Sequence, residues 1–359
     1  MAVSNVSFQT GVNFQEGKQI LSPLITEIAD MVEAEVGLGD EAAKFGFTVG
    51  KVSTPDGVIT SMVWPEYLPE INEDGETPLL VLTQGYDKGY QMKTYGGRIK
   101  VTKLFLEWLK TASTLQGADS SVKSELNKFK DGIIRLMRSS KRTINRELTN
   151  VLAKGFSVTA AYWPGSAGGD GVSLFNAAHP VKSEPGVTYS NLRAAALSAA
   201  ELEAAIQAYK TTVKAPSGFR IDTPDTFTLL VPRALETTAR KILNSSGDQA
   251  GLWAGTGSNA NLLNVFSFQG SKVELVVLDM LGETDKAGGK IGGANADNMW
   301  FLLNKSYALE YGAFRIFTLW SDEIETWYDN NTKSTFTDLT CHWGVDFYNP
   351  EAIMWFPGA

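Results

Sequence analysis

The sequence predicts an α+β fold, in which a long helix and several strands occupy separate stretches of the chain. Residues 120–154 contain no proline and repeat apolar residues at helical spacing. Residues 46–105 and 321–347 contain short apolar runs, turn residues and period-two alternation, which are typical of strands. The 359 residues are 43% hydrophobic and 20% charged, a globular composition that can bury a core without disulfides.

Charge and cysteine content exclude several classes of protein. The net charge of −8 argues against a general nucleic-acid binder. A protein of this net charge can still carry a local basic face. The single cysteine, Cys341, excludes an internal disulfide and a zinc site built from CxxC pairs. The first residues lack a basic segment followed by an apolar run, so we expect no secretory signal. Residues 249–271 are uncharged, but their Gly, Ser and Asn content argues against a membrane helix.

The first third of the chain is predicted to hold a helix and then extended structure. Residues 22–37 begin with a Ser-Pro pair and end with glycine, which are typical helix boundaries. The following strands include a hairpin that runs from about residue 78 to 100. Its turn is predicted at residues 85–89, which contain two glycines and an aspartate.

The helix over residues 120–154 carries two different stripes. One is apolar and consists of Leu126, Phe129, Ile133, Met137, Ile144, Leu148 and Val151. The other is basic and consists of Arg135, Arg138, Arg142 and Arg146, which follow i, i+3, i+7 and i+11. One face of this helix is therefore basic although the whole protein is acidic.

The remaining elements alternate between helix and strand and then become β-rich. Ser198 and Glu201 form a capping box at the start of a helix that ends near Thr212. Further elements are a strand over 227–231, a helix from Pro232 to Asn244, and strands over 273–278 and 300–303. The C-terminal part is predicted as strands around 324–328 and 339–347, with a turn at 329–331 between them.

No pattern in the sequence predicts a catalytic, cofactor or metal site. Cys341 and His342 are adjacent in a strand, so their side chains point to opposite faces and cannot share one metal. His179 has no obvious nucleophile or acid near it in the sequence and is interpreted as structural. The segment from Gly255 to Ala260 fits GxGxxA, but no clear strand precedes it and no clear helix follows it.

The order of several short motifs resembles that of tailed-bacteriophage major capsid (major head) proteins, in particular a Mu-like major head subunit group. The motifs are SLFNAAHP at 173–180, TYSNL at 188–192, LLVP at 229–232, ARKIL at 239–243, VELVV at 273–277, WFLL at 300–303 and PEAI at 350–353. The resemblance implies a Hong Kong 97-like capsid fold, with an N-terminal arm, an E-loop hairpin, a P domain that contains a long spine helix, and an A domain.

The resemblance implies a domain assignment for each stretch of the chain. Residues 1–45 would be the arm and 46–105 the E-loop region. Residues 106–197 and 321–347 would form the P domain, with the spine helix at 120–154, and residues 198–320 and 348–359 the A domain. The E-loop candidates for contacts between subunits are Tyr86, Lys88, Tyr90, Lys93 and Tyr95. The four spine arginines are the candidates for a basic surface that faces the lumen.

The implied function is that of a structural protein and not an enzyme. Hexamers and pentamers of the chain would build an icosahedral head shell around double-stranded DNA, in a virion assembled in the host cytoplasm. The chain begins almost directly at the arm, which implies either a separate scaffolding protein or none. The resemblance further implies a portal as a partner and leaves a decoration protein open. One branch of the family links an E-loop lysine to an asparagine, for which Lys88, Lys93, Asn330 and Asn331 are weak candidates.

Two alternatives remain open from the sequence. The first is an encapsulin-like compartment, which would use the same fold but enclose protein cargo. The second is a soluble enzyme that holds a nucleotide in the loop from Gly255 to Ala260.

Overall fold

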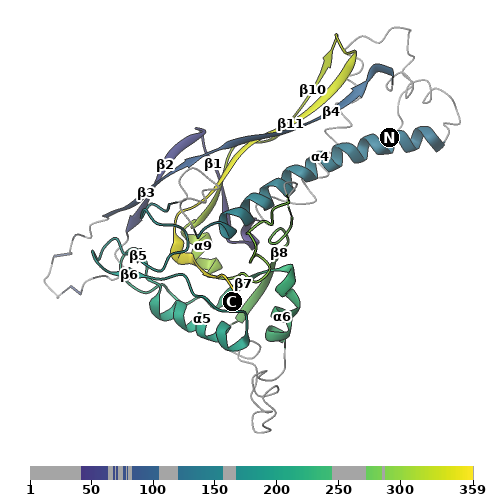
Figure 1. Cartoon of the computed structure of the whole chain (residues 1–359). Coiled ribbons are helices and arrows are strands. Elements are labelled where there is room, and N and C mark those ends of the chain that lie inside the picture. Colours follow the sequence, from purple (N-terminus) through teal and green to yellow (C-terminus); the bar gives the residue numbers. More distant parts are fainter. Residues whose placement is uncertain are drawn as a thin grey trace, which may run out of the picture. The chain divides into compact units, whose positions relative to one another are not determined.

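The computed structural model contains one long helix, several shorter helices and two four-stranded sheets (Figure 1). It describes residues 42–63, 68, 70, 71, 76, 77, 79, 83–104, 120–156, 167–244, 272–284 and 288–358. The described residues fall into two compact units. One contains residues 93–144 and 320–343, and the other contains residues 42–92, 145–319 and 344–358.

In the first unit, helix α4 (Ser120–Ala153) lies along a pair of long strands. Strand β4 (Lys93–Thr102) pairs antiparallel with β11 (Ser334–Phe347), with Gly97 opposite Leu339. A Cβ atom on Gly97 would approach Leu136 of α4 to 2.6 Å, so this glycine allows the helix to pack closely on the strand. The helix predicted over residues 120–154 is confirmed.

The turn predicted at residues 329–331 is also confirmed. It joins β10 (Phe314–Asp329) to β11, and the Asp329 carboxylate accepts hydrogen bonds from the Asn331 backbone and the Thr332 hydroxyl. In β11 the burial alternates as far as Thr340, but every residue from Cys341 to Phe347 is buried. The predicted period-two strand is therefore covered on both faces at its C-terminal end.

The core of the second unit is a four-stranded sheet in the order β12-β9-β7-β8. Its strands are β7 (Thr226–Pro232), β8 (Lys272–Leu278), β9 (Trp300–Leu303) and β12 (Ile353–Phe356). β7 and β8 are parallel, whereas β7 pairs antiparallel with β9 and β9 with β12. Trp300 stacks on Phe356 across the sheet, and both side chains are fully buried.

Two helices complete this core, and a third lies at its edge. In α5 (Ala199–Thr212) the Ser198 hydroxyl accepts a hydrogen bond from the Glu201 backbone, which confirms the predicted cap. α6 (Arg233–Asn244) begins one residue later than predicted, because Pro232 is the last residue of β7. α9 (Lys305–Glu310) follows β9 directly and is capped by Asn304.

Three further strands of this unit lie in the first third of the chain. β1 (Phe47–Lys51) pairs parallel with the first five residues of β10. β2 (Asp56–Val63) pairs antiparallel with β3 (Thr83–Gln91), and residues 64–82 connect the two strands. The expectation of extended structure in this stretch is confirmed.

The predicted hairpin turn at residues 85–89 is wrong, because these residues lie inside β3. The two glycines in this segment allow β3 to lie close to its partner strand and do not form a turn. A Cβ atom on Gly85 would lie 2.3 Å from the Ser61 hydroxyl oxygen, and Gly89 pairs opposite Val58. The hairpin is therefore β2–β3, and its tip lies at residues 64–82 instead of 85–89.

Candidate functional site

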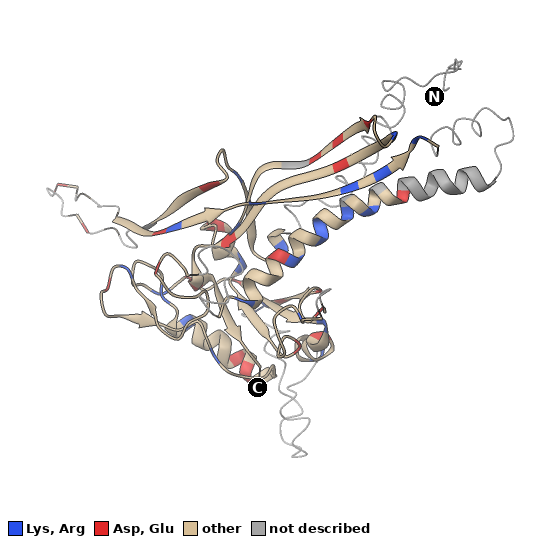
Figure 2. Cartoon of the chain, turned by 45° about the horizontal axis from the view of Figure 1, so that its top comes forward, with Lys and Arg blue, Asp and Glu red and all other residues tan. Residues whose placement is uncertain are grey.

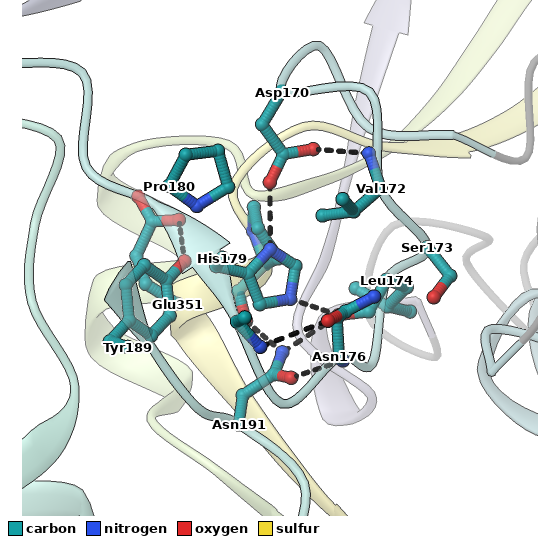
Figure 3. Close-up of polar contacts among 12 residues, drawn as sticks. Asp170, Val172, Ser173, Leu174, Asn176, His179, Pro180, Tyr189, Asn191 and Glu351 are labelled. Carbon is teal, nitrogen blue, oxygen red and sulfur yellow. Dashed lines mark hydrogen bonds and ion pairs between the residues drawn. The ribbon is translucent and has the colours of Figure 1, made fainter. Parts of the chain in front are cut away.

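A cluster of buried polar side chains lies beneath the loop that contains β5 (His179–Pro180) and β6 (Thr188–Tyr189) (Figure 3). His179 is fully buried; its Nδ1 lies 2.7 Å from the Asp170 carboxylate and its Nε2 lies 3.2 Å from the Leu174 carbonyl oxygen. Asp170 reaches this position through a turn in which its other oxygen accepts the Val172 backbone N–H and Gly171 adopts a φ of +83°. The histidine is therefore held on both ring nitrogens.

Asn191 joins this loop to the C-terminal segment of the chain. Its side-chain amide donates to the carbonyl oxygens of Leu174 and Pro350 at 2.7 and 3.0 Å. Its carbonyl oxygen accepts the Asn176 backbone N–H at 2.9 Å. Because Asn191 has no solvent exposure, losing any of these bonds would leave a buried polar group without a partner.

Glu351 lies in the 3-10 helix η1 (Pro350–Ala352), where tyrosines surround it. The Tyr307 hydroxyl donates to one carboxylate oxygen at 2.9 Å, and the Tyr189 hydroxyl reaches the other at 3.5 Å. The Tyr209 hydroxyl donates to the Glu351 backbone carbonyl at 3.0 Å. Burial raises the pKa of the Glu351 carboxyl from 4.5 to about 7. Burial and the nearby carboxylate also raise the pKa values of Tyr189 and Tyr307.

This geometry suits a structural role better than catalysis. The cavity that touches Asp170, Tyr189 and Glu351 has a volume of about 20 Å³, which is room for about one water molecule. His179 is thus the satisfied structural histidine that we predicted. The expectation that it has no acid nearby is wrong, because a loop turn brings Asp170 to it.

A second buried polar contact lies at the base of the β2–β3 hairpin. The Lys88 ammonium is 2.6 Å from the Asp346 carboxylate and 2.8 Å from the Phe347 carbonyl oxygen. It also lies 3.3 Å from the centroid of the Phe347 ring. Burial lowers the pKa of Lys88 and raises that of Asp346 to about 6. The contact between Lys88 and Asp346 fixes β3 to the end of β11.

The structure changes the interpretation of the predicted E-loop residues. Lys88 and Tyr90 are buried within their own chain, and Tyr90 stacks on Phe317 at 4.5 Å. Tyr86 is half-buried and donates a hydrogen bond to the Pro180 carbonyl oxygen. Assigning Lys88 and Tyr90 to contacts between subunits, or Lys88 to a cross-link, does not fit these positions, because their contacts are internal.

The other two E-loop candidates lie in β4. Tyr95 stacks on Trp343 at 4.5 Å, and Lys93 is exposed opposite Trp343 in the strand register. Asn330 and Asn331, the predicted partners of a cross-link, are exposed in the turn after β10. The apolar side chains exposed near the hairpin tip are instead Leu68, Ile71 and Leu79, of which Leu68 and Leu79 are 84% and 88% exposed.

Basic residues recur along α4, where they are drawn in blue (Figure 2). The predicted basic face is exposed to solvent. All four of its arginines, Arg135, Arg138, Arg142 and Arg146, have exposed side chains. Arg146 donates to the fully buried carboxylate of Glu147 at 2.9 Å. Arg146 therefore has an internal structural partner as well as an exposed side chain.

The Cys341–His342 pair has a structural explanation, whereas the glycine-rich loop lies outside the described residues. Cys341 and His342 make separate contacts, as the strand geometry predicts: the Cys341 sulfur accepts from the Trp343 indole, and His342 Nδ1 lies 2.7 Å from the Thr94 hydroxyl. The loop from Gly255 to Ala260 lies outside the described residues, as do residues 1–41 of the predicted arm with the helix predicted at residues 22–37. None of the described helices is long and apolar enough to cross a membrane.

Comparison with known proteins gives one family match. A family model described as phage capsid protein matches residues 85–355, about three quarters of the chain. No curated protein sequence matches the chain.

Several solved structures resemble the chain weakly. They include the capsid of cyanophage P-SCSP1u (10% identity, 88% of this chain and 86% of that chain covered, TM-score 0.46). A structure of Mycobacterium phage Patience matches with 11% identity, 94% and 88% coverage, and a TM-score of 0.45. A virus-like particle from Pyrococcus furiosus matches with 10% identity, 93% and 98% coverage, and a TM-score of 0.43.

Proposed function

The chain belongs to the phage capsid protein family, and we propose that it is the major subunit of an icosahedral head shell that encloses double-stranded DNA. The observation that carries this proposal is the family match over residues 85–355, which extends from β3 to β12. Membership of this family makes the chain a capsid-forming structural protein of the virion. We also propose that hexamers and pentamers are the building units of the shell and that the chain has no enzymatic role.

The proposal includes the Hong Kong 97-like architecture and the Mu-like group. The order of elements supports the architecture: a β2–β3 hairpin precedes the long helix α4, and a compact sheet with flanking helices follows it. In this assignment α4 is the spine helix and the β2–β3 hairpin is the E-loop. The four-stranded sheet with α5 and α6 is the core of the A domain.

The hairpin tip is the proposed contact with a neighbouring subunit. Leu68, Ile71 and Leu79 expose apolar surface there, and an isolated two-stranded hairpin is marginally stable in water. Residues 64–82 also include five acidic and no basic residues. A neighbouring copy that covers the apolar side chains would explain their exposure in the single chain.

The arginines of α4 are the proposed lumen surface. Arg135, Arg138 and Arg142 are exposed on a protein of net charge −8, so a local positive potential forms where the rest of the molecule repels phosphate. Such a surface attracts DNA without reading its sequence. The scaffolding, portal and decoration proteins expected from the family resemblance remain proposed partners.

Electron microscopy of the purified full-length chain tests the proposed function. We expect closed shells or rings of subunits, with far more than two copies per particle. Nucleic acid extracted from particles made during infection separates a head shell from a compartment that holds protein cargo. A persistent monomer or dimer at high concentration, with and without a co-expressed scaffold, would contradict the proposal.

A further inference from the structure

Lys88 and Asp346 form a buried contact whose atoms are placed for a covalent reaction as well as for an ion pair. The two side chains are 4% and 3% exposed, and Nζ of Lys88 lies 2.6 Å from Oδ1 of Asp346. A C=O bond adds about 1.2 Å, so Nζ lies within about 3.8 Å of the carboxyl carbon Cγ. Reacting atoms in a near-attack arrangement are about 3–3.5 Å apart. The lysine nitrogen is therefore close to the distance from which it can attack this carbon.

The two oxygens of the Asp346 carboxyl group have different surroundings. Oδ1 accepts hydrogen bonds from the Phe347 backbone N–H at 2.8 Å and from the Lys88 ammonium. Oδ2 is buried and has no hydrogen-bond partner among the described residues. A backbone N–H in this position stabilises the negative charge that develops on Oδ1 when a nucleophile attacks Cγ. Oδ1 is thus suited to remain as an amide oxygen, and Oδ2 is suited to leave.

The surroundings of Lys88 favour its neutral amine, which is the nucleophilic form. Nζ lies 3.3 Å from the centroid of the Phe347 ring, and burial lowers the pKa of the ammonium. Burial also raises the pKa of Asp346 to about 6, so transfer of a proton from the ammonium to the carboxylate costs less than in water. Two buried charges carry a desolvation cost that a neutral amide avoids.

We propose that Lys88 and Asp346 are the site of a spontaneous isopeptide bond within one chain, in which an amide replaces the ion pair. Nζ bonds to Cγ, and the bond between Cγ and Oδ2 breaks. Two of the three ammonium protons move to Oδ2, which leaves as water, so the step consumes no oxidant or second substrate. The remaining N–H can donate to the Phe347 carbonyl oxygen, which Nζ already contacts at 2.8 Å. Until the bond forms, the two groups are held as an ion pair.

The bond would fasten the base of the β2–β3 hairpin covalently. Lys88 lies in β3 and Asp346 in β11, 258 residues later in the sequence, and both belong to the second unit. Pulling the hairpin base away from β11 would then require breaking an amide instead of separating an ion pair. The bond lies within one chain and joins lysine to aspartate, and it does not depend on the proposed shell function.

Mass spectrometry of the purified full chain tests the bond. Under denaturing conditions we expect the intact chain to be lighter than its sequence by the mass of one water molecule. Trypsin cleaves after unmodified lysine and arginine but not after an acylated lysine. The bond should therefore give a branched peptide in which residues 52–93 are joined to residues 334–359, with no cleavage after Lys88.

Matched variants separate this bond from other losses of water. Lys88→Arg keeps the positive charge and should have the full mass of its sequence. Lys51→Arg, at an exposed position of β1, should still lose one water. An Asp–Gly pair such as Asp170–Gly171 can also lose water, by forming a cyclic imide, but its tryptic peptides stay unbranched.

Several results would overturn the proposal. These are the full sequence mass in the folded wild type, a loss of water that persists in Lys88→Arg, and a ladder of linked copies on a denaturing gel, which would place the bond between chains. The mass of the wild type decides the first result even if Lys88→Arg does not fold. Shells built from chains of full mass would overturn the bond and leave the proposed function intact, whereas a linked chain that forms no particles would do the reverse.

Discussion

Glu351 is a fully buried carboxyl group whose carboxylate oxygens are contacted by the hydroxyls of Tyr189 and Tyr307. Desolvation disfavours its charged form and raises its pKa from 4.5 to about 7. Because the folded-state pKa lies above the unfolded one, protonation stabilises the fold. This contribution is full below about pH 4.5 and is lost as the pH rises through about 7.

Replacing Glu351 by Gln should therefore remove part of the pH dependence of stability. Glu351→Gln keeps the shape and stays neutral, so we expect higher stability at pH 8, by at most about 3 kcal/mol, and little change at pH 4.5. Urea unfolding at several pH values measures this difference. Glu310→Gln, at an exposed position, is the control, and an unchanged slope between pH 5 and 8 in Glu351→Gln would contradict the interpretation.

The ion pair between Lys88 and Asp346 gives a different prediction, because both partners carry charge. Asp346→Ala would leave the buried Lys88 ammonium without its counterion, and we expect a loss of about 3–5 kcal/mol in unfolding free energy. The double variant Lys88→Met with Asp346→Leu should recover most of this loss, because it removes both buried charges. Equal losses in the single and double variants would show that the contact is not electrostatic.

Single residues also show what the sequence could not predict. His179 was correctly interpreted as structural, but no spacing rule connects it to Asp170, which a glycine-containing turn brings within 2.7 Å. The burial of Lys88 was missed for a similar reason. Its partner Asp346 lies 258 residues away, and a lysine between glycines in a β-rich segment is typical of an exposed turn.

At the scale of elements, local signals sufficed where a pattern repeats over several turns or strands. The helix α4 and the cap of α5 follow from periodicity and from a local hydrogen bond. The hairpin turn was predicted at the wrong position because glycines are typical both of turns and of close contacts between strands. Only the position of the partner strand distinguishes the two cases. Gly85 contacts Ser61 across the hairpin, and this contact is not encoded locally.

The corrected hairpin boundaries predict which segment assembly can lose. Replacing residues 64–82 by a short Gly/Ser turn should leave a folded subunit, because Lys88 and Tyr90 keep their internal contacts. It should prevent stable shells, because the exposed leucines at the tip are removed. Replacing residues 78–100 should instead unfold the subunit, since it removes all of β3 and most of β4. Circular dichroism measures folding and light scattering measures shell formation in the two variants. Normal shells from the variant without residues 64–82 would refute the assignment of this segment to a contact between subunits.

The basic face of α4 predicts a salt-dependent effect on DNA binding. Changing Arg135, Arg138 and Arg142 to Gln should lower the magnitude of the slope of log affinity against log salt by up to about 3 on duplex DNA. Arg146 is left unchanged because it pairs with buried Glu147. The control changes three exposed lysines elsewhere to Gln: Lys51, Lys103 and Lys272. Equal slopes for wild type and the arginine variant would show that this face does not meet DNA.

At the scale of the whole molecule, assembly should appear as extra stability. Leu68 and Leu79 expose most of their side chains in the single chain, and burying one such side chain contributes about 1.5–3 kcal/mol. Because binding of a neighbour stabilises only the folded state, the melting temperature should rise with protein concentration. We expect a rise of several degrees for the full chain, and none for the variant that lacks residues 64–82. Scanning calorimetry at several concentrations and scan rates measures this, and parallel behaviour of the two proteins would place the stabilising contact outside the hairpin.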